Sequence, residues 1–137
     1  MLAFSGPVIG APHEVIGPVS LRLRIRGSSP NFDVFARLCD VDAKGRSWNI
    51  CDGLLRLDGT RPADADGWSE IEVPMSSTAH RFAAGHRLRV QVSGGAHPRG
   101  ARSTGTAEPI ATATSLVPVD IEINHVTTVL SLPVVLP

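Results

Sequence analysis

The sequence Ser-Leu-Arg-Leu-Arg-Ile-Arg at residues 20–26 alternates strictly between apolar and charged side chains after its first serine. The same period of two returns as His-Arg-Leu-Arg-Val-Gln-Val at residues 86–92 and as Val-Pro-Val-Asp-Ile-Glu-Ile-Asn at residues 117–124, and residues 68–75 repeat it. Because successive side chains of a strand point to opposite faces, each stretch predicts a strand with one buried and one exposed face. Together they indicate antiparallel sheets.

Less regular strands fill the gaps between these stretches. Residues 2–9 predict a first strand, and residues 32–41 are apolar on both faces in places, as a central strand would be. Residues 47–57 follow closely, and the short glycine-containing segment 42–46 between them predicts a hairpin. Residues 127–135 predict the strand that closes the chain.

Helical signals are poor. Residues 76–84 predict one turn or a short helix, with Ser76 or Ser77 as its N-cap and Gly85 as its end. Residues 58–67 form a polar loop, and residues 94–113 form a long irregular stretch rich in Gly, Ser, Thr and Ala. Irregular connections of that length usually carry function or pack against something else.

These strands predict an all-β fold. The chain has 137 residues, 42% of them hydrophobic, which is the size and composition of one folded domain at residues 1–137. Its 13 glycines and 11 prolines mark frequent turns. Seven or eight short strands need two layers to bury their apolar faces, so we expect a two-sheet antiparallel β-sandwich.

The charge balance and the hydropathy of the sequence argue against two classes of binding partner. Thirteen basic and thirteen acidic side chains cancel, which argues against binding to nucleic acid or to an anionic membrane surface. No apolar run approaches the roughly 20 residues of a spanning helix. The first seven residues lack the basic start of a signal peptide. We therefore expect a cytoplasmic protein with no nucleic-acid and no membrane partner.

Catalytic motifs are absent from the sequence. No serine stands in the G-x-S-x-G frame of the α/β-hydrolase elbow, and the five histidines are scattered. Cys39 and Cys51 lie too far apart in sequence for a zinc pair. Mirroring the hairpin about residues 44–45 puts Cys39 opposite Asn49 or Ile50, so we expect two free thiols. The sequence predicts no catalytic residue, no cofactor and no metal.

Two surface features have alternative interpretations. Rows of outward arginines and glutamates on neighbouring strands predict cross-strand ion pairs better than an anion site. Carbohydrate binding by a β-sandwich usually needs an aromatic platform, for which Trp48 and Trp68 are the candidates. Either tryptophan could instead belong to the core or to an interface.

Several short motifs in a fixed order carry a family resemblance. They are Gly-Pro-Val-Ser-Leu at residues 17–21, Leu-Cys-Asp-Val at 38–41, Gly-Arg-Ser at 45–47, Cys-Asp-Gly-Leu-Leu-Arg at 51–56, Thr-Ala-His-Arg-Phe at 78–82, and residues 85–93. In order and spacing the chain resembles, over about residues 2–135, the C-terminal domain of the X-Pro dipeptidyl-peptidase and cocaine-esterase-like (CocE/NonD) serine hydrolases.

The resemblance implies a jelly-roll sandwich similar to galactose-binding domains. It also implies that the Ser-Asp-His triad belongs to a preceding α/β-hydrolase domain, so the chain would be a fragment lying C-terminal to an absent catalytic domain. One departure concerns the loop after Arg99, where the family tends to carry an aromatic residue and an Arg-Asn pair. Here Arg102 is present, whereas the aromatic residue and the asparagine are not.

The expected role is a non-catalytic module that packs on its own hydrolase domain and shapes the approach to the active site, with a possible homo-oligomer. Residues 49–56 and 97–104, together with Trp48, are the predicted docking surface. Its candidate residues are Trp48, Asn49, Asp52, Gly53, Leu54, Arg56, His97, Pro98, Arg99 and Arg102. A carbohydrate-binding module and, more remotely, a stand-alone esterase are the alternatives.

Overall fold

The computed structural model describes residues 1–136, and none of them is helical. The strands are β1 (Leu2–Val8), β2 (His13–Gly27), β3 (Asn31–Val41), β4 (Ser47–Asp58), β5 (Ser69–Phe82), β6 (Arg87–Ser93) and β7 (Ile121–Ser131). The all-β prediction is therefore confirmed.

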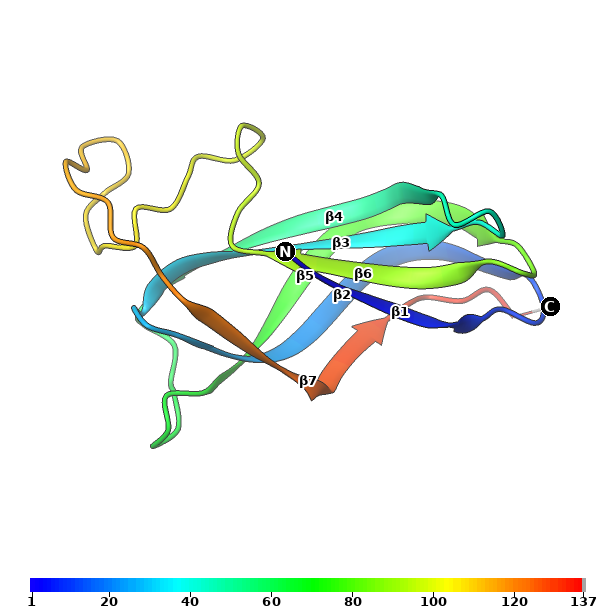
Figure 1. Cartoon of the computed structure of the whole chain (residues 1–137), viewed down its shortest axis with the longest axis horizontal. Helices are drawn as coiled ribbons and strands as arrows, with labels where there is room; N and C mark the ends of the chain where they lie inside the picture. The colour runs from blue at the N-terminus through cyan, green and yellow to red at the C-terminus, as the bar shows by residue number, and fades with distance from the viewer. Residues whose placement is uncertain (137) are drawn as a thin grey trace.

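Two antiparallel sheets face each other (Figure 1). Sheet A has the strand order β1-β6-β3-β4, and sheet B has the order β5-β2-β7. Because β2, β5 and β7 lie in one sheet and their sequence neighbours in the other, the chain crosses repeatedly between layers. This confirms a jelly-roll-like β-sandwich, while the likeness to galactose-binding domains stays a prediction.

The core lies between the sheets and comes from the alternating stretches. Leu21, Leu23 and Ile25 of β2 are almost completely buried, as are Ile71 and Val73 of β5. Each such side chain contributes about 1.5–3 kcal/mol when it leaves water. The period of two at residues 20–26 therefore assigned the inner face of sheet B correctly.

The predicted hairpin joins β3 to β4. Cys39 lies opposite Asn49, as expected, and Cys51 lies opposite Leu38. Cys51 belongs to the core cluster, whereas Cys39 lies on the other side of the sheet. Both thiols are buried and free, which confirms the prediction from sequence.

The predicted turn or helix at residues 76–84 is wrong, because β5 continues to Phe82. The pairing of β5 with β2 is irregular opposite Gly17 and Val19, and beyond this bulge Thr78–Phe82 pairs with the start of β2. A bulge shifts the alternation by one residue. Buried positions are odd-numbered up to Met75 and even-numbered at Phe82, so the period disappears from the sequence.

The two predicted C-terminal strands are one. Residues 117–120 do not belong to a strand, and Val117 is exposed rather than inside. Its backbone N–H donates to the carbonyl of Thr104 at 2.8 Å, in the long loop and not in a sheet. From Ile121 the chain pairs with β2 up to Ser131 with one irregularity. Ile123 lies opposite Ile25, and Leu130 lies opposite Leu21, again on opposite phases of the sequence.

Charged side chains cover the outer face of sheet B. Arg22 lies opposite Glu72, and Arg24 lies opposite Glu70, as the sequence predicts for neighbouring rows. Arg26 donates two hydrogen bonds to Glu122 of β7, at 2.8 and 3.0 Å. This outer face is a solvated ladder of opposite charges.

Candidate functional site

The long connections of the fold gather at one end of the sandwich. Figure 1 shows residues 59–68 and residues 94–120 at the same end, together with the link between β2 and β3. The opposite end carries short turns, such as residues 42–46, and the segment that follows β7. Loops on a rigid sandwich commonly carry function, so we expect contacts with other molecules at the loop end.

Only the second half of the predicted segment 49–56 lies beside the predicted segment 97–104 at this end. The guanidinium of Arg99 donates to the carboxylate of Asp52 in β4. Arg56, further along β4, donates from Nη2 to the carbonyl of Ala101 at 2.6 Å. The side chain of Leu54 lies between these two contacts and packs beside Gly100, where a Cβ atom would come within 2.9 Å of it. Residues 52–56 and 97–104 therefore form one continuous surface.

A buried carboxylate fixes this surface from below. Asp33 of β3 is 1% exposed and accepts two hydrogen bonds from Arg56, from Nε and from Nη2, each of 2.7 Å. This planar two-point contact raises the pKa of the Arg56 guanidinium, although burial opposes the rise. Sequence reasoning missed Asp33. Its only signal is an acidic residue within an apolar strand, in register with an arginine.

The other predicted residues have different surroundings. Trp48 and Asn49 begin β4 near the short turn, at the opposite end of that strand from Arg56. Gly53 faces β5, where a Cβ atom would lie 2.0 Å from the carbonyl oxygen of Pro74. His97, Pro98 and Arg102 are exposed in the long loop.

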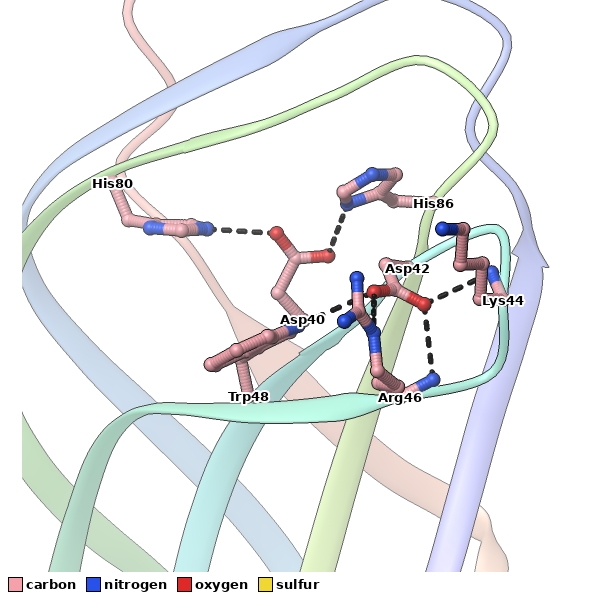
Figure 2. A network of polar contacts seen from close by, with 7 residues as sticks. All are labelled: Asp40, Asp42, Lys44, Arg46, Trp48, His80 and His86. Atoms are coloured by element: carbon pink, nitrogen blue, oxygen red, sulfur yellow. Dashed lines mark hydrogen bonds and ion pairs between the residues drawn. The ribbon is translucent and has the colours of Figure 1, made fainter.

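A second buried carboxylate lies at the short-turn end. The Asp40 side chain is 6% exposed and binds two imidazoles, Nε2 of His80 at 2.9 Å and Nδ1 of His86 at 2.8 Å (Figure 2). Asp40 belongs to sheet A and His80 to sheet B, so the carboxylate ties the sheets together. Nothing in the spacing of these residues along the chain indicates that one aspartate brings the two histidines together.

Asp42 organises the neighbouring turn. Its carboxylate accepts the backbone N–H groups of Lys44 and Arg46 at 2.9 and 3.0 Å and the Nε–H of Arg46 at 2.7 Å (Figure 2). Burial opposes ionisation, but these hydrogen bonds and one from Trp48 outweigh it and hold the pKa of Asp42 well below its ordinary value. Gly45 supplies the positive φ of 82° that closes the turn.

An aspartate–imidazole pair is two parts of a hydrolase triad, whose third part is a nucleophile. Among residues 1–136 the only side chain hydrogen-bonded to either ring is Asp40. Within the same residues no three His, Cys, Asp or Glu side chains form a group that could hold a metal ion. The described chain also has no helix that is long and apolar enough to span a membrane. The observed role of Asp40 is to join the sheets.

Both tryptophans carry a guanidinium over the ring. Arg46 lies 5.6 Å from the centre of the Trp48 ring, and Arg26 lies 4.9 Å from that of Trp68. Such stacking is favourable, and it occupies surface that a sugar ring would need. Neither tryptophan gives support to the carbohydrate-binding alternative.

Comparisons with known proteins agree with the fold. An aminopeptidase from a marine sediment Thaumarchaeota archaeon matches 98% of this chain with a TM-score of 0.87 and 21% identity, over 25% of its own length. An alpha-amino acid ester hydrolase matches 97% of the chain with a TM-score of 0.85 and 21% identity, also over 25% of its length. These two structures show the jelly-roll-like fold.

Sequence comparison is more specific. The cocaine esterase of Rhodococcus sp. (strain MB1 Bresler) is 35% identical over 117 residues, which cover 81% of this chain and 20% of the esterase. The chain thus spans about a fifth of that relative. Residues 2–129 match the model of the X-Pro dipeptidyl-peptidase C-terminal non-catalytic domain. The chain belongs to this family, the non-catalytic C-terminal modules of X-Pro dipeptidyl-peptidase and cocaine-esterase-like hydrolases.

Proposed function

We propose that this chain is the non-catalytic C-terminal module of a serine hydrolase of the X-Pro dipeptidyl-peptidase or acyl esterase type. It packs against an α/β-hydrolase domain and shapes the approach to the active site there. The hydrolase domain supplies the nucleophile and forms the acyl-enzyme. The module supplies a docking surface and no catalytic residue. The protein functions in the cytoplasm, whose reducing conditions agree with the two free cysteines.

The observation that carries the proposal is the continuity of the two docking segments. Asp52 binds Arg99, and Arg56 binds the Ala101 carbonyl, so residues 52–56 and 97–104 present one surface. This surface lies at the loop end of a rigid sandwich, where long connections commonly contact partners. Asn49, opposite the outward-facing Cys39, extends the proposed surface along β4. Trp48 stands opposite Asp40 and points to the other side of the strand. Self-association stays a prediction.

A reconstitution experiment tests the proposal. The Rhodococcus esterase is expressed without the 117-residue segment that this chain matches, alone or together with this chain. We expect a complex on gel filtration and ester hydrolysis at least about tenfold above that of the truncated esterase alone, a gain of about 1.4 kcal/mol.

The matched control is this chain with Gly53→Val. Its new side chain collides with the Pro74 carbonyl, so the sandwich cannot close at β4 and β5. We expect no complex and no gain in activity from this variant. Equal activity with and without the wild-type chain, and separate elution of the two proteins, would overturn the proposal.

A further inference from the structure

The outer face of sheet A is unusually buried. In β3, Val34, Ala36 and Leu38 join the core between the sheets, so the residues between them face away from it. Yet of these outward residues Phe35 is only 8% exposed and Cys39 is 0% exposed. Arg37 stacks over Phe35, and Asn49 and Arg89 stand opposite Cys39 on the two neighbouring strands.

Charge is distributed unequally between the two outer faces. By register, the outer face of sheet B carries equal numbers of arginines (Arg22, Arg24, Arg26, Arg81) and glutamates (Glu14, Glu70, Glu72, Glu122). The outer face of sheet A and its loop carry six arginines, Arg37, Arg56, Arg87, Arg89, Arg99 and Arg102, against three aspartates, Asp33, Asp52 and Asp58. A chain with no net charge therefore has one basic face.

Two of the three aspartates on this face, Asp33 and Asp52, lie beneath arginines, whereas Asp58 is exposed. The side chains of Asp33 and Asp52 are 1% and 11% exposed, whereas those of Arg56 and Arg99 are 39% and 65% exposed. Arg37 stacks over the Phe35 ring at 5.0 Å. Each buried aspartate thus holds a guanidinium in a fixed position at the surface, which lowers the entropy lost when a partner binds.

We propose that the outer face of sheet A with the 94–104 loop is a preorganised basic docking face that fits a carboxylate-rich protein surface. This rests on the proposed function and gives the chemistry of the hydrolase surface that the module meets. Leu54, 37% exposed, supplies an apolar contact between Arg56 and Arg99. An apolar contact flanked by arginines is typical of protein interfaces, whereas single-stranded nucleic acid needs exposed aromatic rings, and Phe35 is covered.

The electrostatic contribution to docking is measured from the association constant of this chain with the truncated Rhodococcus esterase. Raising NaCl from about 50 to about 300 mM shortens the screening length, and we expect the association constant to fall by about tenfold. Arg102→Glu should lower it by about tenfold, and the control Arg22→Glu by less than about twofold. Both side chains are exposed and make no hydrogen bond or ion pair within residues 1–136, but Arg22 lies on sheet B.

The outcomes separate the two proposals. The complex could form with an affinity that does not depend on salt and that Arg102→Glu and Arg22→Glu change equally. That result would overturn the basic docking face and leave the proposed function standing. Absence of any complex overturns both. Tighter binding to a single-stranded oligonucleotide than to the esterase assigns the face to nucleic acid and overturns the protein partner.

A separate variant tests whether the fixed position of the Arg56 guanidinium matters for docking. Arg56→Lys keeps the charge but cannot make the two-point contact with Asp33 while also reaching the Ala101 carbonyl. We expect a drop in affinity of a few fold, and faster hydrogen exchange of the amides near residue 101 in the isolated chain. Affinity and exchange like those of the wild type would show that the fixed guanidinium is not needed and would overturn the preorganised part.

Discussion

The outer faces of sheets A and B differ in how far solvent reaches the residues that point away from the core. On sheet B the outward residue Ile16 is 59% exposed, and Arg26 pairs with Glu122 in solvent. On sheet A the outward residues Phe35 and Asp33 are 8% and 1% exposed. On sheet A, Arg37 stacks over Phe35, and Arg56 binds Asp33 while it also donates to the Ala101 carbonyl of the long loop. An outward position in a strand is therefore not by itself an exposed one.

The largest expected effect is the loss of an outward aromatic side chain. Phe35→Ala should lower the free energy of unfolding by about 3 kcal/mol, because a nearly buried ring leaves a cavity. Its counterpart on sheet B, Ile16→Ala, should cost less than about 1 kcal/mol. Urea denaturation followed by tryptophan fluorescence measures both values. Equal losses would break the comparison.

The next largest expected effect is a difference in stability between variants that remove an ion pair from each outer face. Asp33→Ala leaves Arg56 without its partner, and we expect a loss of about 2 kcal/mol, moderated because Arg56 is 39% exposed. Glu122→Ala on sheet B removes an exposed partner of Arg26 and should cost less than about 1 kcal/mol. Thermal unfolding of the two variants at low and high salt gives the values. A larger loss for Glu122→Ala would contradict the assignment of the buried pair to sheet A.

Cysteine labelling reports on the cover over sheet A. Cys39 and Cys51 are buried, and burial, followed by the charges of Asp52 and Cys39, raises the pKa of the Cys51 thiol. We expect both to react with a thiol reagent at least about 100-fold more slowly in the native chain than in urea. Asn49→Ala should speed the labelling of Cys39 only, because Asn49 Oδ1 lies 3.6 Å from its sulfur. Faster labelling of Cys51 instead would show that Cys51, and not Cys39, lies on the outer face of sheet A.

The smallest effect concerns acid stability at the edge of sheet B. The backbone N–H of Trp68, and then that of Asp66 and the charges of Arg24 and Arg26, lower the pKa of Asp64 against the opposing effect of burial. A folded-state pKa below the unfolded value of about 4 stabilises the protein above that pH, and the gain is lost as pH falls through the lowered pKa.

Thermal unfolding between about pH 2 and pH 7 checks this linkage. Wild-type chain should melt slightly above Asp64→Asn at neutral pH, and the two curves should converge toward the acid end. Identical melting of the two chains at every pH would show that the loop hydrogen bonds of Asp64 add no stability to sheet B.

Much of the fold followed from the period of two. Residues 20–26, 68–75 and 86–92 became parts of β2, β5 and β6, with the predicted side facing the core. The two errors have different physical reasons. At residues 76–84 the alternation changes phase at a bulge in the pairing of β5 with β2, which leaves no composition signal of its own. Residues 117–120 alternate as a strand would but lie beyond the point where β7 pairs with β2, and Val117 bonds to the loop at Thr104 instead.

The candidate surface was predictable only in outline. Length and irregularity pointed to residues 97–104, and family resemblance pointed to residues 49–56, but nothing in the sequence showed that Asp52 meets Arg99. Asp33 and Asp40 were not recognised, because an acidic residue in an apolar strand gains its partner only from strand register and from the packing of the second sheet.

The amino-acid sequence by itself determined the all-β class, the inner faces of the strands, the hairpin and the unpaired cysteines, since each depends on neighbours a few residues apart. The tertiary structure decided which outer face is covered, which carboxylates are buried and where the basic charges gather. Those properties depend on residues far apart in the chain, such as Arg56 and Ala101, and only the closed sandwich brings such residues within hydrogen-bonding distance.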